Sequence, residues 1–394
     1  MSGRIASALA ALLLLSAALP STDPARVFDQ VWNAVERRYW DPSLHGVDWN
    51  AARGRFRAHA LAAPDSAALY AVLNRMLELL HDSHVFAIPP AEVRYEAARD
   101  AGEAQASFGF AAYEEGGSWL VYAVTPDSPA ARAGVRPGWR LASIDGRPVD
   151  VDRHPAVGQR SQLVFHDAGG QPRPLELVAT SAVPSPNVRT RTLAGDVLLV
   201  TLEGFGGRDD RRIAAALQGG AETSAVILDL RDNDGGEEEA AARVAGLFFA
   251  EKHTLLRRID RHHEDKVPIE GAGGRSFTGP MAVLVGPRSA SAAEALAALL
   301  DETGRATSVG ERTAGALTGA SLEPLADGGQ LSLADFDVRT PGGKRIEGVG
   351  FTPAHIVRTT PADMAAGRDP VLVAALRLVT PLSLSRAETL HARP

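Results

Sequence analysis

Residues 281–302 read MAVLVGPRSASAAEALAALLDE, and this stretch decides the fold class. It opens with a short apolar run at 281–285, passes through a turn, and continues as an alanine- and leucine-rich helix from Ala292. A continuous apolar run of this length, bounded by turn residues, is typical of a strand buried on both faces. The stretch therefore predicts a strand, a turn and a helix in succession.

The same pattern recurs on the N-terminal side of this stretch. Apolar runs lie at 197–200 and 225–228, and a helical pattern covers 238–249. Buried strands that alternate with helices indicate a largely parallel sheet with helices on both faces. We therefore expect an α/β catalytic domain over residues 190–375, followed by a C-terminal tail at 376–394.

The first part of the chain has a helical pattern. Apolar residues recur at helical spacing over 27–39 and again over 66–80, and a turn is expected at 46–49 between them. These segments predict a helical domain over 21–92. Residues 91–104 are polar and rich in alanine and glutamate, and they are interpreted as a linker.

Short strands at 119–124 and 141–144 follow, with one short helix in the segment 128–139. A further strand begins at Ser107-Phe108-Gly109-Phe110. Short strands with a single short helix predict a compact α+β module over 100–185.

The N-terminus has the features of an export signal. Arg4 precedes an apolar stretch at 5–19, which is short for a membrane span. We expect a signal peptide over 1–20 and an exported, periplasmic or extracellular protein. The alternative is an uncleaved segment that gives transient membrane association.

Composition excludes several classes of function. A net charge of −7 without a basic run argues against a nucleic-acid partner. The absence of cysteine excludes a thiol nucleophile, disulfides and thiolate metal sites. Adjacent histidines in His262-His263-Glu264-Asp265 do not by themselves make a ligand set, so we expect no metal and no cofactor.

Three segments carry polar groups suited to catalysis. Ser291 stands at a strand-to-helix junction, where the Ala292 amide is free to receive an oxyanion, although position alone favours an ordinary helix cap. Gly235 and Gly236 follow the strand at 225–228 and offer unhindered amides, or simply a tight turn. His84 ends the second helical pattern, and an isolated surface histidine is more often inert.

The combination of these segments resembles the tail-specific (C-terminal processing) serine peptidases. The resemblance rests on Ser291 three residues before Glu294, on the intact Asp-Leu-Arg-x-Asn-x-Gly-Gly element at 229–236, and on a PDZ-like module. It covers roughly residues 25–375. It implies a crotonase/ClpP-like catalytic domain with an inserted PDZ-like module, in which Phe108, Gly109 and Phe110 bind a peptide carboxylate. Ser107 replaces the usual first glycine of that loop.

One departure from the family decides the expected base. Many members have a lysine in a Thr-x-Gly-Lys turn, and here that turn reads Thr313-Ala314-Gly315-Ala316. The lysines of the chain are Lys252, Lys266 and Lys344, and none of them stands in this turn. A serine–lysine dyad at the family position is therefore excluded.

The other branch of the family, which is similar to the tricorn core peptidase, uses a Ser-His pair and a distant glutamate. Ser83-His84 and Glu347 match these positions. The resemblance implies that Ser291 is the nucleophile and His84 its base, and that Ser83 orients the histidine under the control of Glu347. Asp82 as the orienting acid is the alternative for that role.

The oxyanion would then be bound by the amides of Ala292 and of Gly235 or Gly236. The expected function is endopeptidase cleavage of proteins or peptides, with the PDZ-like module selecting or presenting them. The alternative is a protein of the same fold that binds peptides or hydrophobic ligands without cleaving them. The sequence does not indicate an oligomeric state.

Overall fold

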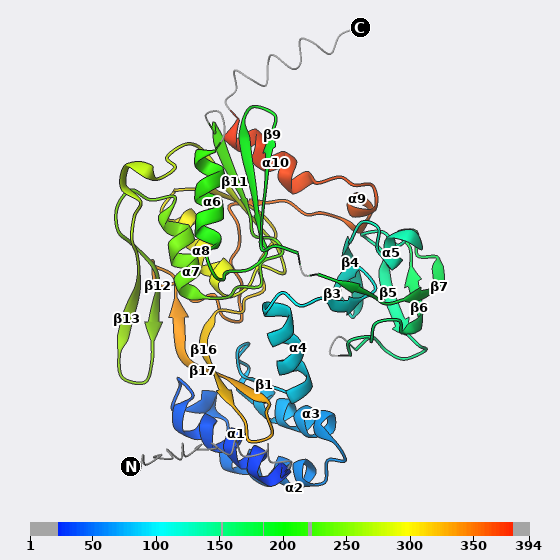
Figure 1. The fold of residues 1–394 in the computed structure, drawn as a ribbon. Coiled ribbons are helices and arrows are strands. Elements are labelled where there is room, and N and C mark those ends of the chain that lie inside the picture. Colours follow the sequence, from blue (N-terminus) through cyan, green and yellow to red (C-terminus); the bar gives the residue numbers. More distant parts are fainter. Residues whose placement is uncertain (1–22, 151–152, 184, 220–222, 381–394) are drawn as a thin grey trace, which may run out of the picture.

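The computed structural model describes residues 23–150, 153–183, 185–219 and 223–380 (Figure 1). The expected signal peptide and the part of the expected tail beyond Thr380 lie outside these ranges. Within them, no helix is both long enough and apolar enough to cross a membrane.

Three helices and a short 3-10 turn form the N-terminal helical domain. The helices are α1 (Pro24–Arg38), α2 (Trp49–Leu61) and α3 (Ser66–Leu77). The 3-10 turn is η2 (Glu78–Leu80), and a second one, η1 (Leu44–Gly46), lies between α1 and α2. The side chains of Asp23, Asp48 and Asp65 each accept a hydrogen bond from an amide of the following first turn, as helix caps do. The prediction of a turn before Trp49 missed the helix α2 that begins there.

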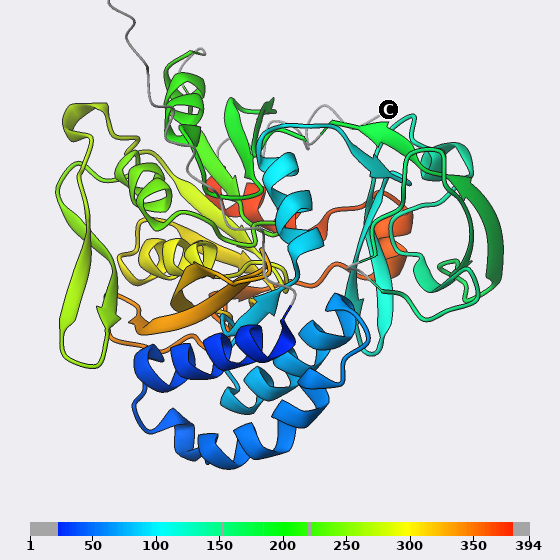
Figure 2. The ribbon, with the colours of Figure 1, turned by 60° about the horizontal axis from the view of Figure 1, so that its bottom comes forward.

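Helix α4 (Pro90–Asp100) stands where a linker was predicted, so that prediction was wrong. Proline at the first helical position and the alanine, glutamate and arginine residues that follow favour a helix. None of its residues is buried, and it therefore lacks the apolar stripe by which helices are recognised in a sequence. The helix rises from the helical domain, and the segment that follows it crosses to the PDZ-like module (Figure 2).

The PDZ-like module is built on an antiparallel sheet in the order β3-β4-β5-β6-β7. Its core includes Val121, Leu163 and Phe165, which are fully buried. The elements of the module are β2 (Gln105–Ser107), β3 (Phe110–Glu115), β4 (Ser118–Val124), α5 (Pro129–Arg132), β5 (Arg140–Ile144), β6 (Arg160–His166), β7 (Pro172–Val178) and β8 (Thr180–Ala182).

The catalytic domain holds the predicted sheet, in the order β18-β15-β14-β11-β10-β9. All neighbouring strands in it are parallel except the pair β9 and β10. The strands are β9 (Val188–Leu193), β10 (Val197–Leu202), β11 (Ala225–Asp229), β14 (Met281–Val285), β15 (Thr307–Gly310) and β18 (His355–Ile356). The predicted α/β fold with an inserted PDZ-like module and an N-terminal helical domain is confirmed.

Helices cover both faces of this sheet. One face packs against α6 (Asp209–Gln218), α7 (Glu238–Gly246) and α8 (Ala292–Glu302). The other packs against α10 (Pro370–Val379), which follows the short helix α9 (Pro361–Ala365). The apolar runs of the sequence are therefore buried on both sides, as continuous apolar strands require.

A second sheet joins the helical domain to the catalytic domain. Its order is β1-β17-β12-β13, with β16 also paired to β17. The strands are β1 (Phe86–Ile88), β12 (His253–Ile259), β13 (Glu264–Ile269), β16 (Thr318–Pro324) and β17 (Gln330–Arg339), and the turn η3 (Gly273–Arg275) follows β13. Strand β1 belongs to the N-terminal part of the chain and pairs antiparallel with β17, with Phe86 opposite Ser332. This pairing holds the segment just before β1, which contains His84, against the catalytic domain.

Candidate active site

Ser291 lies in the turn between β14 and α8 with an unusual backbone conformation. Its φ is 54° and its ψ −123°, whereas an ordinary helix-cap serine has an extended backbone. Strain of this kind persists only where the surroundings enforce it, and it is found most often at functional sites. Here the Ser291 amide is held by the Ala316 carbonyl at 2.8 Å and by the Glu294 carboxylate at 3.2 Å.

The glycine pair of the loop 229–236 lies directly against Ser291. A Cβ atom on Gly235 would lie 2.6 Å from the Ser291 Cβ, and one on Gly236 would lie 2.2 Å from the Phe205 carbonyl oxygen. Their φ angles of 110° and 121° also disfavour any side chain. Gly235 is thus required for the close approach of this loop to Ser291, and Gly236 for its approach to the backbone of Phe205.

The three expected oxyanion donors differ in this structure. The Gly235 amide donates to the Asn233 Oδ1 atom at 2.9 Å, so it is already engaged. Among the described residues, the amides of Gly236 and Ala292 donate to no other group, and both residues line the pocket that holds Ser291. The pair that can receive an oxyanion is therefore Gly236 and Ala292.

Ser83, His84 and Glu347 form one chain of hydrogen bonds. The Ser83 Oγ atom lies 2.8 Å from both the His84 Nδ1 atom and the Glu347 Oε2 atom. A carboxylate can only accept, so the Ser83 hydroxyl donates to Glu347 and accepts from the Nδ1–H group of the histidine. This leaves the Nε2 atom of His84 without a proton.

The environment of His84 keeps the imidazole neutral. Burial lowers the pKa of His84 below its usual value, against the carboxylates of Glu347 and Asp82, which act to raise it. His84 and Ser291 line the same pocket of about 500 Å³. No hydrogen bond joins their side chains within the described part of the chain, and such bonds are often loose before substrate binds.

Asp82 is held away from the imidazole by other partners. Its Oδ2 atom accepts from the Tyr39 hydroxyl at 3.0 Å and from the Trp40 indole at 3.2 Å. Its Oδ1 atom accepts from the Thr318 hydroxyl at 2.8 Å and the His84 amide at 3.1 Å. This carboxylate therefore fixes the backbone of the Ser-His segment, whereas Glu347 reaches the imidazole through Ser83.

Three segments of the chain match models of known protein families. Residues 196–357 match peptidase family S41, residues 20–78 match the tricorn protease C1 domain, and residues 120–158 match a PDZ domain. The C-terminal part of this chain thus has the peptidase domain of family S41. The protein is a tail-specific serine-type peptidase, and thus a hydrolase, with a PDZ domain.

Curated relatives resemble this S41 peptidase over most of its length. It is 28% identical to the carboxyl-terminal-processing peptidase 3 of Arabidopsis thaliana chloroplasts, over 89% of this chain and 72% of the relative. It is 27% identical to the carboxyl-terminal-processing protease of a Picosynechococcus strain, over 96% of each chain.

Solved structures share the fold of this S41 peptidase. The photosystem II D1 C-terminal processing protease superposes with a TM-score of 0.65 at 23% identity, over 92% of this chain and 99% of that chain. The tricorn protease superposes with a TM-score of 0.56 at 15% identity, over 90% of this chain and 36% of that chain.

A buried glutamate that sequence reasoning used only as a marker organises the S41 site. Glu294 accepts hydrogen bonds from the Thr313 hydroxyl and from the amides of Gly315, Ala316 and Ser291. Burial raises the pKa of Glu294, and these four bonds act to lower it. The turn 313–316, which contains no lysine, is thereby fixed beside Ser291.

The pocket of the S41 peptidase also contains residues that the sequence did not indicate. The Phe336 ring lies over Gly319 of the neighbouring strand, where a Cβ atom would meet it at 1.7 Å. The Arg258 guanidinium stacks on Phe336 at 5.0 Å and pairs with Glu238. Leu256 and Val338 are largely buried and line the same pocket. The pocket thus has an apolar wall with one ion pair.

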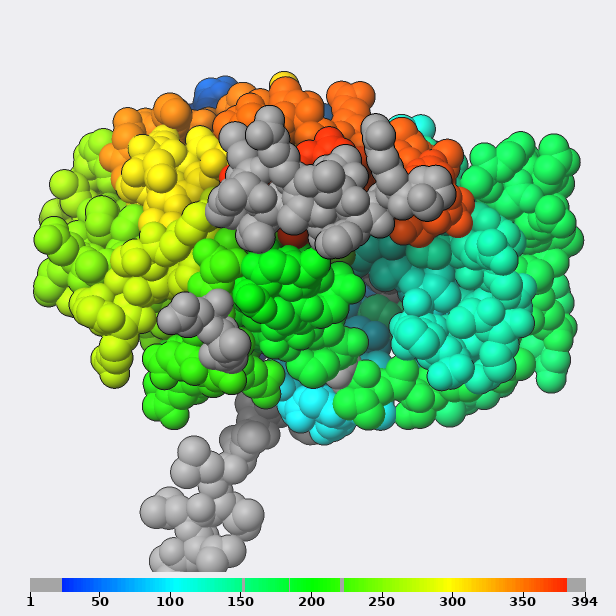
Figure 3. Space-filling view, turned by 90° about the horizontal axis from the view of Figure 1, so that it is seen from above, coloured from blue at the N-terminus to red at the C-terminus, as the bar shows by residue number. Residues whose placement is uncertain are grey.

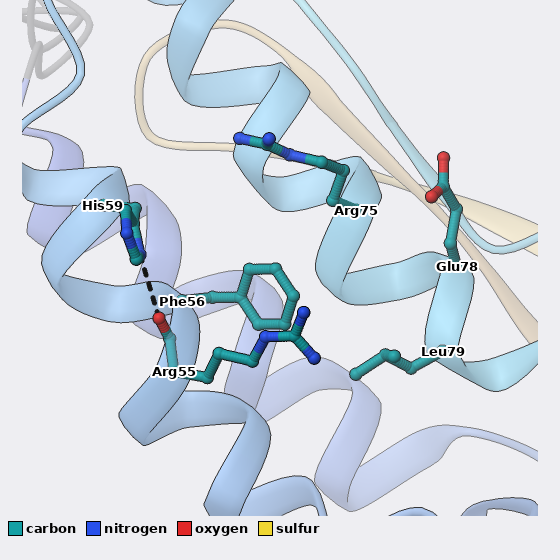
Figure 4. A pocket seen from close by; sticks show the side chains of 6 residues that line it. All are labelled: Arg55, Phe56, His59, Arg75, Glu78 and Leu79. Atoms are coloured by element: carbon teal, nitrogen blue, oxygen red, sulfur yellow. Dashed lines mark hydrogen bonds between the residues drawn. The ribbon is translucent and has the colours of Figure 1, made fainter.

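The surface of the S41 peptidase has two further hollows. The surface is hollowed between the catalytic domain and the PDZ domain (Figure 3). A smaller hollow of about 350 Å³ lies between α2 and α3 (Figure 4), where the His59 imidazole bonds the Arg55 carbonyl of its own helix. Its lining residues are Arg55, Phe56, His59, Arg75, Glu78 and Leu79.

The cluster His262-His263-Glu264-Asp265 forms a turn and the start of β13. The amides of His262 and His263 both donate to Asp260. Within residues 23–380, apart from the undescribed gaps, no group of three potential ligands could hold a metal ion.

Proposed function

We propose that this peptidase is a serine endopeptidase in which Ser291 attacks the scissile carbonyl and His84 is the general base. The observation that carries this proposal is the chain of hydrogen bonds from Glu347 through Ser83 to the Nδ1 atom of His84, in the pocket that Ser291 also lines. This chain selects the tautomer whose Nε2 atom can take the serine proton.

Each step then has a group to perform it. Ser291 Oγ forms a bond to the carbonyl carbon as its proton passes to His84 Nε2. The oxyanion that results is received by the amides of Gly236 and Ala292. The imidazolium returns the proton to the leaving amine, and water repeats the sequence to release the acyl group.

The low pKa of His84 suits this cycle. An imidazole that burial keeps neutral is available as a base even in mildly acidic solution. Glu347 is itself buried, with 5% of its surface exposed, and it is held by the Leu317 amide at 2.7 Å and the Ser83 amide at 2.9 Å. Its charge stabilises the imidazolium that forms during turnover.

The PDZ domain would select or present substrates through their C-termini. The loop 107–110 precedes the edge strand β3, and edge strands accept an added peptide strand in domains of this kind. The substrates are proteins or peptides, and we place the enzyme outside the cytoplasm, in the periplasm or the extracellular space, on the basis of the apolar N-terminal segment.

A fluorophosphonate probe tests the proposal directly. It should label the purified wild-type protein on the peptide that contains Ser291 and block hydrolysis of a protein substrate in the same proportion. Labelling at another residue, or hydrolysis that survives complete labelling, would contradict the assignment. A folded but unreactive protein that binds peptides would support the non-catalytic alternative.

A further inference from the structure

Arg288 connects the nucleophile loop to the PDZ domain. Its Cζ atom lies 3.8 Å from the centroid of the Tyr122 ring and 4.6 Å from that of the Tyr113 ring. Tyr113 belongs to β3 and Tyr122 to β4, so both rings come from the PDZ sheet. The guanidinium also pairs with the Asp232 carboxylate of the glycine loop. Arginine suits such a place because it stacks on rings and pairs with carboxylates at once.

Arg288 and its partner Asp232 lie in the two loops that carry the proposed oxyanion donors. The nucleophile loop 286–291 leads to the Ala292 amide, and the glycine loop 229–236 ends at the Gly236 amide. The two loops are joined by a bond from Ser289 Oγ to the Leu230 carbonyl at 2.7 Å and by one from the Ala290 amide to the Asn233 carbonyl at 3.0 Å. The pair of Arg288 and Asp232 is a third link, and among these three links between described residues it is the one that contacts the PDZ domain.

This third link lies mostly inside the protein. The Nε atom of Arg288 is buried without a hydrogen-bond partner among the described residues, while Nη2 reaches Asp232. Burial raises the pKa values of Tyr113 and Tyr122, and nearby carboxylates raise them further. A cation held by two ring faces and one carboxylate has its position fixed from both domains.

We infer that Arg288 is a positioning residue, which sets the distance between the two oxyanion donors through Asp232 and ties that distance to the contact with Tyr113 and Tyr122. The inference rests on the proposed function. It implies that turnover requires an intact contact between the PDZ domain and the nucleophile loop, because a displacement of about 1 Å at a catalytic group can cost roughly a hundredfold in rate.

The test compares Arg288→Gln with a matched change elsewhere. Arg53→Gln also removes an arginine that stacks on an aromatic ring, Trp32 at 4.9 Å, and pairs with a carboxylate, Asp29, but it lies in the helical domain. For each variant, kcat is measured per fluorophosphonate-reactive site, together with KM and the affinity for a peptide aldehyde, which forms a tetrahedral adduct with the nucleophile.

We expect Arg288→Gln to lower kcat roughly ten- to a hundredfold and to weaken aldehyde binding in proportion, with little change in KM. Arg53→Gln should leave all three quantities unchanged. Arg288→Lys should recover part of the loss because it keeps the charge. In the PDZ domain, the double change Tyr113→Leu and Tyr122→Leu should reproduce the loss, whereas changing both tyrosines to Phe should not.

The outcomes separate the inference from the proposed function. If Ser291→Ala is inactive while Arg288→Gln and the double leucine variant keep the wild-type kcat, the positioning role is wrong and the nucleophile stands. If Ser291→Ala remains active, the proposed function itself is wrong. A loss of kcat confined to variants whose melting temperature also falls, with aldehyde affinity per reactive site unchanged, would mean that Arg288 only stabilises the fold.

Discussion

The carboxylate of Glu347 receives both the amide and the hydroxyl of Ser83, at 2.9 and 2.8 Å, across 264 residues of sequence. Two bonds from one residue to the two oxygens of one carboxylate fix the Ser83 side chain in a single orientation. That orientation directs its oxygen to the His84 ring. The position of the imidazole is therefore set by a residue from the far end of the chain.

Replacing the nucleophile should abolish activity and leave the fold intact. Ser291→Ala removes only the Oγ atom, and we expect turnover to fall roughly a millionfold, as when other serine peptidases lose their nucleophile. Ser289→Ala is the matched control. Its hydroxyl is fully buried and bonds the Leu230 carbonyl and the Gly286 amide, so its loss should lower stability by about 1–3 kcal/mol while Ser291 still takes the label. A label on Ser289 would contradict the assignment.

The pH profile should identify the base. Because burial lowers the pKa of His84, kcat should rise with pH and reach half its plateau below about 6.5, the usual histidine value. His84→Ala should reduce kcat by roughly a hundredfold or more and remove this inflection. His81→Ala, in the same turn, should change neither. An acidic limb that persists in His84→Ala would point to another base.

Glu347→Gln should impair catalysis less than loss of the histidine. The amide keeps the shape of the side chain but carries no charge to stabilise the imidazolium, and its NH2 group must face the Leu317 amide or a Ser83 donor. A charge-assisted hydrogen bond contributes about 1.5–3 kcal/mol. We expect kcat to fall by about tenfold, the lower end of that range, because the glutamine oxygen can still accept one of the bonds from Ser83. The measurement is kcat at the pH plateau, and a loss as large as that of His84→Ala would mean that Glu347 does more than orient Ser83.

Glu294→Gln should act on stability. The carboxylate accepts from four donors around the turn 313–316, and its two oxygens each receive one amide, of Gly315 or of Ala316, for which no other partner is present among the described residues. The NH2 group of a glutamine would face one of these two amides and leave it without an acceptor. We expect the free energy of unfolding in urea to fall by about 1–3 kcal/mol. Glu251→Gln, on the exposed surface, is the control. Unchanged stability would show that the turn is held by its backbone alone.

The carboxylate loop of the PDZ domain predicts a gain of affinity on a single change. The Gly109 amide donates to the Ser107 hydroxyl at 2.9 Å, which engages one donor of the loop. Ser107→Gly should free this amide and strengthen the binding of peptides that end in a free carboxylate, as measured by calorimetry. Amidated peptides should bind weakly to both proteins, and equal affinity for the two peptide types would refute the role of the loop.

The sequence predicted the fold correctly where burial produces a recognisable run of apolar residues. The strands β10, β11 and β14 are continuous apolar runs because both of their faces are covered. Helix α4 was missed because it buries no residue. Helix α2 was missed because two of its four buried positions are alanines, Ala52 and Ala60, and arginines lie between the buried positions.

The site followed from the sequence only in part, because its parts meet through tertiary contacts. Motif resemblance indicated Ser291, His84 and Glu347. In the structure, Ser291 and His84 line one pocket, and Glu347 is linked to His84 through Ser83. The engagement of the Gly235 amide by Asn233 depends on how the loop closes, which no spacing reveals. Arg288 had no sequence signal, since its partners Tyr113 and Tyr122 belong to another domain.

The pairing of β1 with β17 has a consequence for the order in which activity appears. A ribosome delivers His84 early, but strand β17 and Glu347 emerge only when most of the chain has been made. Until then the histidine has neither its docking strand nor its orienting acid. On the proposed mechanism, we expect the newly made chain to be inert while it is being synthesised, and a truncated product that ends before residue 330 to be unable to digest its neighbours.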